Sequence, residues 1–86
     1  MMAFQVIWSA QALRQLAAMW NVASKSLRLE ITRAQHRIDQ ALASDPKTFG
    51  VELSEGLWKI HDSPLLAFYE INETHGILRV TDVYIY

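Results

Sequence analysis

Three apolar segments are separated only by short polar connections, and this arrangement constrains the fold more than any other feature of the chain. The segments are Leu57 to His61, Leu65 to Ile71 and Ile77 to Ile85. Asp62-Ser63-Pro64 joins the first pair, and Asn72 to Gly76 joins the second pair. Because segments joined so closely pair most readily with their neighbours, the pattern predicts an antiparallel three-stranded meander.

One strand and two helices are predicted before the meander. Ala3 to Trp8 forms a short apolar strand. Two helices follow, separated by a break that begins at Asn21, and Asp45-Pro46 ends the second of them. Serine hydroxyls are the expected N-caps: Ser9 for the first helix, and Ser24 or Ser26 for the second. So short a break predicts an antiparallel helical hairpin.

Apolar residues recur at helical spacing in both helices and predict how the hairpin packs. The expected contact residues are Leu13, Leu16, Trp20, Ile31, Ile38 and Leu42. Basic residues fall outside this stripe and are expected to face solvent: Lys25, Arg28, Arg33 and Arg37. The segment from Pro46 to Gly56 is predicted to be a polar connection. The expected fold class is α+β, with a strand, a helical hairpin, a three-stranded meander, and the helices packed on one sheet face.

Length and composition limit the class of protein. With 86 residues, of which 51% are hydrophobic and 20% charged, the chain is expected to form a single domain over residues 1–86. The absence of cysteine excludes disulfides and thiolate metal sites. The apolar start from Met1 to Leu13 lacks the basic opening of a secretory signal, and no apolar run approaches membrane-span length. A soluble, cytoplasmic protein is expected.

Charge is distributed unevenly, although the formal net charge is only −1. Residues 9–44 contain five basic and two acidic residues, whereas residues 45–86 contain three basic and seven acidic residues. The predicted hairpin is therefore the cationic part of the chain. A solvated helix face explains such a stripe more simply than a site for a polyanion.

Few residues form a pattern that suggests chemistry. Motifs for dinucleotide, phosphate-loop, zinc-protease or hydrolase sites are absent, so no cofactor or metal is expected. His36 and Asp39 are spaced for a surface hydrogen bond, and His75 is expected to be solvated in a turn. Lys59 and His61 project from the same face of one predicted strand. A lysine for phosphate charge beside an imidazole for proton transfer could support RNA cleavage, although an ordinary exposed polar face explains this spacing equally well.

The order and spacing of these segments resemble the RelE/ParE superfamily of toxins from bacterial toxin–antitoxin systems, also known as plasmid stabilisation proteins. The resemblance covers essentially the whole chain. It rests on Val6-Ile7-Trp8-Ser9 before Ala12-Leu13-Leu16, Ile38-Asp39 through Asp45-Pro46, Leu53 to Gly56, Trp58-Lys59-Ile60, Phe68-Tyr69-Glu70-Ile71 and Val80-Thr81-Asp82-Val83.

The resemblance implies a growth-arresting toxin held inactive by a cognate antitoxin encoded beside it. One branch of the family resembles metal-independent endoribonucleases that cut messenger RNA on the ribosome and so inhibit translation. The other branch resembles inhibitors of DNA gyrase. For the nuclease branch, the residues implied as catalytic are Lys59, His61, Arg79 and Tyr86. The family commonly has an arginine where this chain has Leu66.

Three functional interpretations therefore stay open. The first is a toxin that cleaves messenger RNA through its sheet face. The second is a toxin directed at gyrase or another protein, for which the basic helices matter more. The third is a catalytically degenerate member that mainly binds its antitoxin. None of the three implies a contact with a membrane.

Overall fold

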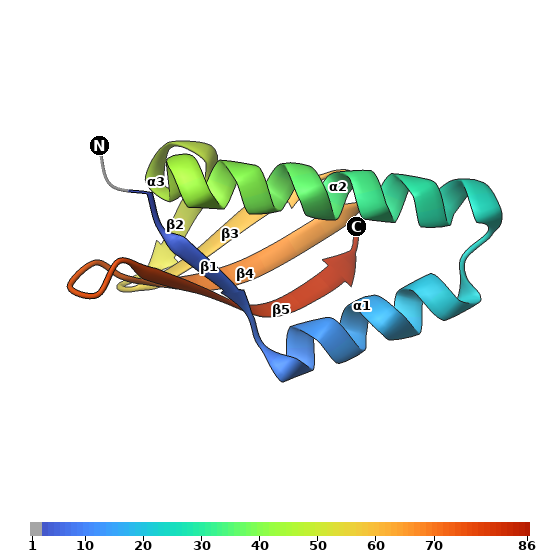
Figure 1. Cartoon of the computed structure of the whole chain (residues 1–86), viewed down its shortest axis with the longest axis horizontal. Helices are drawn as coiled ribbons and strands as arrows, with labels where there is room; N and C mark the ends of the chain where they lie inside the picture. Colours follow the sequence, from blue (N-terminus) through green and yellow to red (C-terminus); the bar gives the residue numbers. More distant parts are fainter. Residues whose placement is uncertain (1–2) are drawn as a thin grey trace.

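The computed structural model describes residues 3–86; Met1 and Met2, which belong to the apolar start discussed above, lie outside the described residues. Figure 1 shows the order of elements along the chain. They are β1 (Gln5–Trp8), α1 (Ala10–Val22), α2 (Lys25–Ser44), α3 (Pro46–Phe49), β2 (Val51–Ser54), β3 (Leu57–Asp62), β4 (Leu65–Asn72) and β5 (Ile77–Ile85). The α+β class and the antiparallel β3–β4–β5 meander are confirmed.

The five strands form one sheet in the order β1-β5-β4-β3-β2. β1 pairs in parallel with β5, so strands from opposite ends of the chain lie side by side. In β5, Thr81 is an extra residue, because Phe68 of β4 lies opposite Asp82 while Tyr69 lies opposite Val80. This bulge lets both halves of β5 direct apolar side chains to the same face of the sheet.

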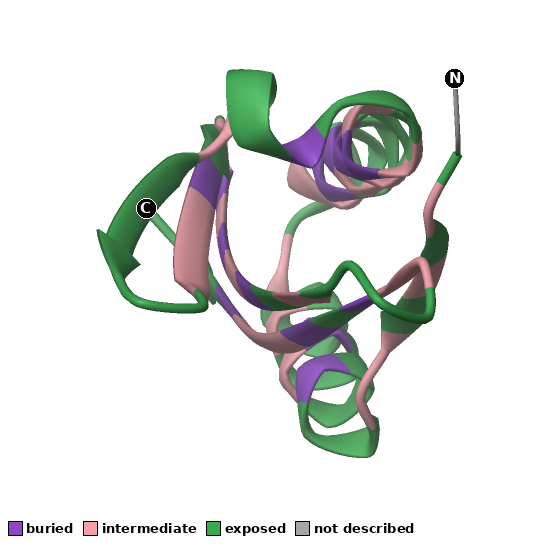
Figure 2. Ribbon diagram, turned by 90° about the vertical axis from the view of Figure 1, so that its left-hand side faces the viewer, coloured by how far each residue is buried: buried purple, intermediate pink, exposed green. Residues whose placement is uncertain are grey.

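Helix α2 crosses that face and covers the core. Its buried residues recur at helical spacing: Ile31, Ala34, Ile38 and Leu42. The strands contribute a buried set of their own: Ile60, Leu65, Ala67, Tyr69, Leu78, Val80 and Val83. Figure 2 shows the buried segments of α2 and of the strands facing one another. Of the described residues, none that is polar or charged belongs to the buried class apart from Tyr69.

Helix α1 lies against β5 beyond the point where β1 ends. Ser9 caps the helix by accepting a hydrogen bond from the Ala12 amide, and its own hydroxyl donates to the carbonyl of Thr81. Ala12 and Leu16 are the α1 residues that enter the core. β1 ends at Trp8, and beyond that residue α1 packs against the edge of β5.

Three predictions about this architecture are wrong. The segment from Pro46 to Gly56 is not merely a polar connection, because it contains the one-turn helix α3 and the edge strand β2. Leu13 and Trp20 do not pack inside a closed hairpin, because they remain 49% and 42% exposed. The first strand begins at Gln5 and not at Ala3. Ser24, not Ser26, is the N-cap of α2, and Asp45 follows its last residue as predicted.

Among residues 3–86, no helix is both long enough and apolar enough to span a membrane.

Candidate functional site

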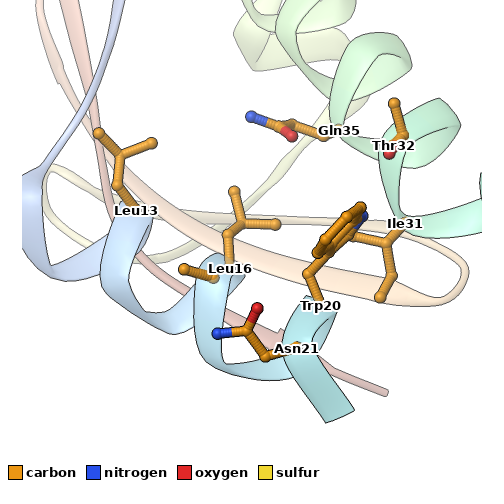
Figure 3. A pocket seen from close by; sticks show the side chains of 8 residues that line it. Leu13, Leu16, Trp20, Asn21, Ile31, Thr32 and Gln35 are labelled. Carbon is orange, nitrogen blue, oxygen red and sulfur yellow. The ribbon is translucent and has the colours of Figure 1, made fainter. Parts of the chain in front are cut away.

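The two long helices diverge from their connection and leave an apolar hollow of about 270 Å³ between them. Figure 3 shows Leu13, Leu16 and Trp20 projecting from α1 into the hollow, with Ile31 of α2 next to Trp20. Only the deep ends of this set, Leu16 and Ile31, are buried. The hairpin interior is therefore a surface open to another molecule.

Arg28 joins the ends of the two helices at the closed end of this hollow. Its Nε donates a 2.9 Å hydrogen bond to the carbonyl of Trp20, and one Nη donates to the carbonyl of Asn21 at 3.2 Å. The guanidinium carbon lies 4.2 Å from the centroid of the Trp20 ring. The cation thus satisfies the last carbonyls of α1 and fixes the exposed indole at the rim of the hollow.

Two further hollows continue the first along α2. One, of about 400 Å³, is lined by Trp20, Lys25, Arg28, Leu29 and Thr32. The other, of about 350 Å³, is lined by Trp8, Thr32, Gln35, His36 and Asp39. Thr32 lines all three hollows, so they adjoin one another along α2, and we call them together the hairpin groove.

The uncovered face of the sheet carries the residues that the resemblance implies for RNA cleavage. Lys59 and His61 project from this face of β3, and Ile60 between them is buried on the other face. The ring of Tyr86 packs edge-on against His61, with centroids 4.8 Å apart and an interplanar angle of 85°. The structure therefore brings together three of the four predicted residues, Lys59, His61 and Tyr86.

Arg79 lies apart from those three residues. It sits on β5 opposite Glu70 of β4, whereas Lys59 on β3 is opposite Phe68 of β4. Ordinary strand spacing and rise place the Cα atoms of Lys59 and Arg79 about 12 Å apart. Two carboxylates, Glu70 and Asp82, share this face with the two cations. The formal charge of this group is zero, and the face offers no cationic surplus to a phosphate backbone.

Asp82 is bound from several sides at the bulge of β5. Gln11 and Gln15 of α1 donate hydrogen bonds to its Oδ1 atom. Burial raises the pKa of Asp82, but hydrogen bonds from Gln11, Thr81, Gln15 and Tyr84 outweigh it and leave the pKa below its ordinary value. Asp82 is thus held ionised as an anchor for α1 and is occupied by protein donors.

Of the remaining histidines, His36 lines the hairpin groove and His75 lies in the turn between β4 and β5. Asp39 accepts a 3.0 Å hydrogen bond from the indole of Trp8, so the expected pairing with His36 is not the one formed. His75 is exposed in its turn, with Nδ1 3.3 Å from the amide oxygen of Asn72. Within residues 3–86, no group of three His, Asp or Glu side chains is arranged to hold a metal ion.

The location of the hairpin groove between α1 and α2 was not predicted from the sequence. Leu29 gives the best signal for it, because this apolar residue falls off the stripe that enters the core and is half exposed. A second apolar face on a helix that already buries one face indicates a further contact surface. Leu13 and Trp20 matched the core stripe by spacing alone and gave no separate signal.

Comparison with known proteins identifies the family. Residues 6–84 match the model of the ParE toxin of type II toxin–antitoxin systems, parDE. No curated protein sequence matches this chain closely enough to identify a relative.

Solved toxin structures share the fold at low sequence identity. The chain is similar to the RelBE2 toxin–antitoxin complex of Mycobacterium tuberculosis, with a TM-score of 0.80, 16% identity, and coverage of 100% of this chain and 94% of that chain. It is similar to the chromosomal ParDE system of Pseudomonas aeruginosa, with a TM-score of 0.74, 12% identity and 96% coverage of both chains. For the isolated Escherichia coli RelE toxin the TM-score is 0.64, with 15% identity over 96% of this chain and 84% of that chain. With the family model matching nearly the whole of the described chain, the protein belongs to the ParE toxin family of type II toxin–antitoxin systems.

Proposed function

We propose that this toxin arrests growth by binding a protein target, with DNA gyrase as that target, and that a cognate antitoxin keeps it inactive. The observation that carries the proposal is the charge balance of the uncovered sheet face. Lys59 and Arg79 are matched there by Glu70 and Asp82. A surface that cleaves RNA needs cations to hold the backbone and to stabilise the phosphorane, so a neutral face favours a different mode of action.

The antitoxin part of the proposal is supported by the two structures of highest TM-score among those described above. Both contain a toxin of this fold together with its antitoxin. In this chain the exposed apolar residues of the hairpin groove give a partner a surface to cover, since a lone small domain rarely leaves a Trp and two Leu exposed together.

The cationic helices are the part of the surface best suited to an acidic protein target. Arg14, Lys25 and Arg33 are exposed on them. Arg37 is already engaged, because its guanidinium forms a bidentate ion pair with Asp62. The hydrogen bond to Asp62 is the main cause that raises the pKa of Arg37.

Ribosome-dependent cleavage of messenger RNA is the second candidate, and one observation favours it. His61 packs against Tyr86 beside Lys59 on one open face, which places an imidazole, a phenol and an ammonium within reach of one ligand. In this mechanism Lys59 stabilises the phosphorane, and His61 or Tyr86 transfers a proton without a metal. Arg79 would serve only to hold a more distant phosphate.

One experiment separates these candidates. The chain is expressed by induction without its antitoxin, and the synthesis of DNA and of protein is followed separately in the same culture. We expect DNA synthesis to stop first and the purified chain to inhibit supercoiling by gyrase. Early arrest of protein synthesis, with cut sites in ribosome-bound message by primer extension, would favour the nuclease. Unimpaired growth with a folded protein would support the degenerate, antitoxin-binding module.

A further inference from the structure

The uncovered face of the sheet carries four charged groups that have no ionic partner within the described chain. They are Lys59 on β3, Glu70 on β4, and Arg79 and Asp82 on β5. Among residues 3–86, the ion pairs are Arg37 with Asp62 and Lys47 with Glu73, and neither pair includes any of the four. Two cations and two carboxylates on one open face are therefore available to another molecule.

Aromatic side chains lie beside these charges on the same face. The rings of Phe68 and Tyr84 meet edge-on, with centroids 6.0 Å apart and an interplanar angle of 76°. Tyr84 is 46% exposed, and Tyr86, which packs against His61, is 75% exposed. Exposed aromatic residues grouped with an arginine are typical of the central part of a protein–protein interface.

Strand register arranges these residues in a regular pattern. Across β3, β4 and β5 they form three rows: His61-Leu66-Tyr84, Lys59-Phe68-Asp82 and Leu57-Glu70-Arg79. In the middle row, the cation and the carboxylate stand on opposite sides of Phe68, each one strand away, which is about 4.8 Å. The face is thus positive on one side of β4 and negative on the other side in this row.

A second copy of the chain matches this pattern. Two sheets that pack face to face lie about 10 Å apart with their strands nearly aligned. A two-fold axis between them, parallel to β4, sets β4 against β4 and sets β3 of each copy against β5 of the other. Lys59 of each copy then meets Asp82 of the other copy, and Phe68 meets Phe68 between these two ion pairs. A two-fold interface requires this kind of self-complementary surface.

The other two rows are compatible with the same axis. In the first row, His61 meets Tyr84 of the second copy, and Leu66 meets Leu66. In the third row the two Glu70 carboxylates approach each other, but Arg79 lies directly opposite Glu70 on each sheet and supplies the balancing charge. Asp82 can receive Lys59 while it holds Gln11 and Gln15 through Oδ1, since a carboxylate has about four acceptor sites.

Other occupants fit this face less well. A nucleic acid or a strongly acidic chain would pair with the two cations and leave the two carboxylates facing negative charge. A strongly basic chain would leave the two cations unmatched in the same way. A second copy brings both signs of charge in the required arrangement.

We infer that the uncovered sheet face is the interface of a homodimer whose two-fold axis runs parallel to β4, with Lys59 of each copy paired to Asp82 of the other. This inference goes beyond the proposed function and does not depend on it. The dimer covers Lys59, His61 and Tyr86, whereas α2 packs on the opposite face of the sheet and stays outside the interface (Figure 2). Formation of the dimer therefore hides the sheet face and leaves the basic residues of α2 accessible.

Sedimentation equilibrium of the full chain, purified without a partner, tests the inference. Three strands make a contact below the standard interface size, so we expect a weak dimer with a dissociation constant of about 1–100 μM. High salt should weaken the dimer, because its ion pairs lie near the surface.

Charge reversal tests the residues of the interface. Lys59→Glu sets a carboxylate against Asp82 at both ion pairs and should weaken the dimer about 30-fold or more. Lys25→Glu makes the same charge change on α2, outside the interface, and should leave the dissociation constant within about threefold. Circular dichroism checks that both variants keep their fold.

Cross-linking tests the direction of the axis and is specific here, because the chain has no cysteine. With the axis parallel to β4, Leu66 of one copy faces Leu66 of the other, so a short bifunctional thiol reagent should link two copies of Leu66→Cys. Gln40→Cys, at an exposed position of α2, should give no linked dimer. An axis across the strands would place the two Leu66 positions at opposite ends of the interface, and failure of Leu66→Cys to cross-link would overturn the assigned axis.

The outcomes separate this inference from the proposed function. A chain that stays monomeric up to about 1 mM overturns the dimer, and binding of a single-stranded oligoribonucleotide by that monomer would assign the face to RNA. A dimer as tight in Lys59→Glu as in Lys25→Glu uses another surface and also overturns the inference. The proposed function is judged by the supercoiling assay alone, so either conclusion can fail while the other stands.

Discussion

The hydroxyl of Tyr69 in β4 donates a hydrogen bond of 2.6 Å to the carbonyl oxygen of Pro46, which begins α3. Tyr69 is fully buried, and its ring stacks at 6.4 Å on that of Trp58 in β3. The bond satisfies two polar atoms in the core and ties α3 to the centre of the sheet. Gly50 makes room for it, since a Cβ there would lie 1.6 Å from the Tyr69 hydroxyl oxygen.

Replacing Gly50 with Ala should destabilise the fold by about 1–3 kcal/mol, the usual cost of overpacking. Tyr69→Phe should cost about 0.5–1.5 kcal/mol, because it removes one of the two hydrogen bonds that the Pro46 carbonyl accepts and leaves only the one from the Gly50 amide. In the double variant the added methyl group no longer meets the tyrosine hydroxyl. Its loss of folding stability should therefore be smaller than the sum of the losses in the two single variants. Urea unfolding of the three variants measures these differences, and strict additivity would show that the two residues do not interact.

Stability should fall at alkaline pH because of the same tyrosine. Burial raises the pKa of Tyr69 from 10.0 to about 12. The unfolded chain therefore releases this proton near pH 10, while the folded chain keeps it until about pH 12. The folded state binds more protons in that window, so the free energy of unfolding decreases as the pH rises through it. Thermal midpoints between pH 9 and 12 should decline less steeply for Tyr69→Phe than for the unmodified chain.

Ile38→Asp should cost several kcal/mol, a large part of the roughly 5–15 kcal/mol that stabilises a typical domain. Ile38 is fully buried, and the carboxylate would lie in an apolar core. Gln40→Asp is the matched control, because Gln40 is exposed two residues further along α2. Thermal unfolding compares the two, and an equal midpoint for both variants would contradict the placement of Ile38 in the core.

Replacing Asp82 with Ala should loosen α1 from the sheet. Gln11 and Gln15 lose their common acceptor, at a cost of about 1–2 kcal/mol, and amides of α1 should exchange faster with solvent. In the unmodified chain the pKa of Asp82 is lower in the folded state than in the unfolded state. Asp82 therefore contributes fully to the free energy of unfolding above its unfolded-state pKa, and this contribution is lost as the pH falls through its folded-state pKa. Hydrogen exchange at neutral pH and unfolding at acid pH measure the two effects.

Lys59→Ala should leave toxicity intact if the target is a protein bound by the helices. The variant should also keep its fold, since Lys59 lies on the uncovered face of the sheet and outside the core. In the nuclease mechanism the same change removes a cation from the phosphorane and should cost about 10²–10³ in rate. Growth after induction decides between them, with His61→Ala expected to be milder under the nuclease mechanism.

Local signals explain how much of the fold could be predicted. The bounds of β5 agree with the apolar segment Ile77 to Ile85, and Ser9 caps α1 as expected, because both features depend on neighbouring residues. β2 was missed, since all four of its residues are exposed and it is a strand only through pairing with β3. The parallel pairing of β1 with β5 joins segments too distant for any local pattern to indicate.

In the candidate site, too, the features set by local spacing could be predicted, and those set by contacts between distant segments could not. Alternation along β3 correctly placed Lys59 and His61 on one face. The carboxylate of Asp82 reaches that face only because Thr81 is an extra residue in β5, and no spacing in the sequence reveals this shift. Helical periodicity placed Leu13 and Trp20 on an apolar stripe, but it cannot distinguish a stripe covered by this chain from one that awaits another chain.

The pairing of β1 with β5 also determines how much of the chain must be synthesised before the protein can fold. Gln5 lies beside Ile77, seventy-two residues later in the chain, and α1 has no surface to pack on until the second half of β5 is present. During synthesis the N-terminal strand and helix must therefore wait for nearly the entire sequence, because contacts between distant segments form only after both have been made. Folded toxin can therefore appear only when translation of its own sequence is nearly complete.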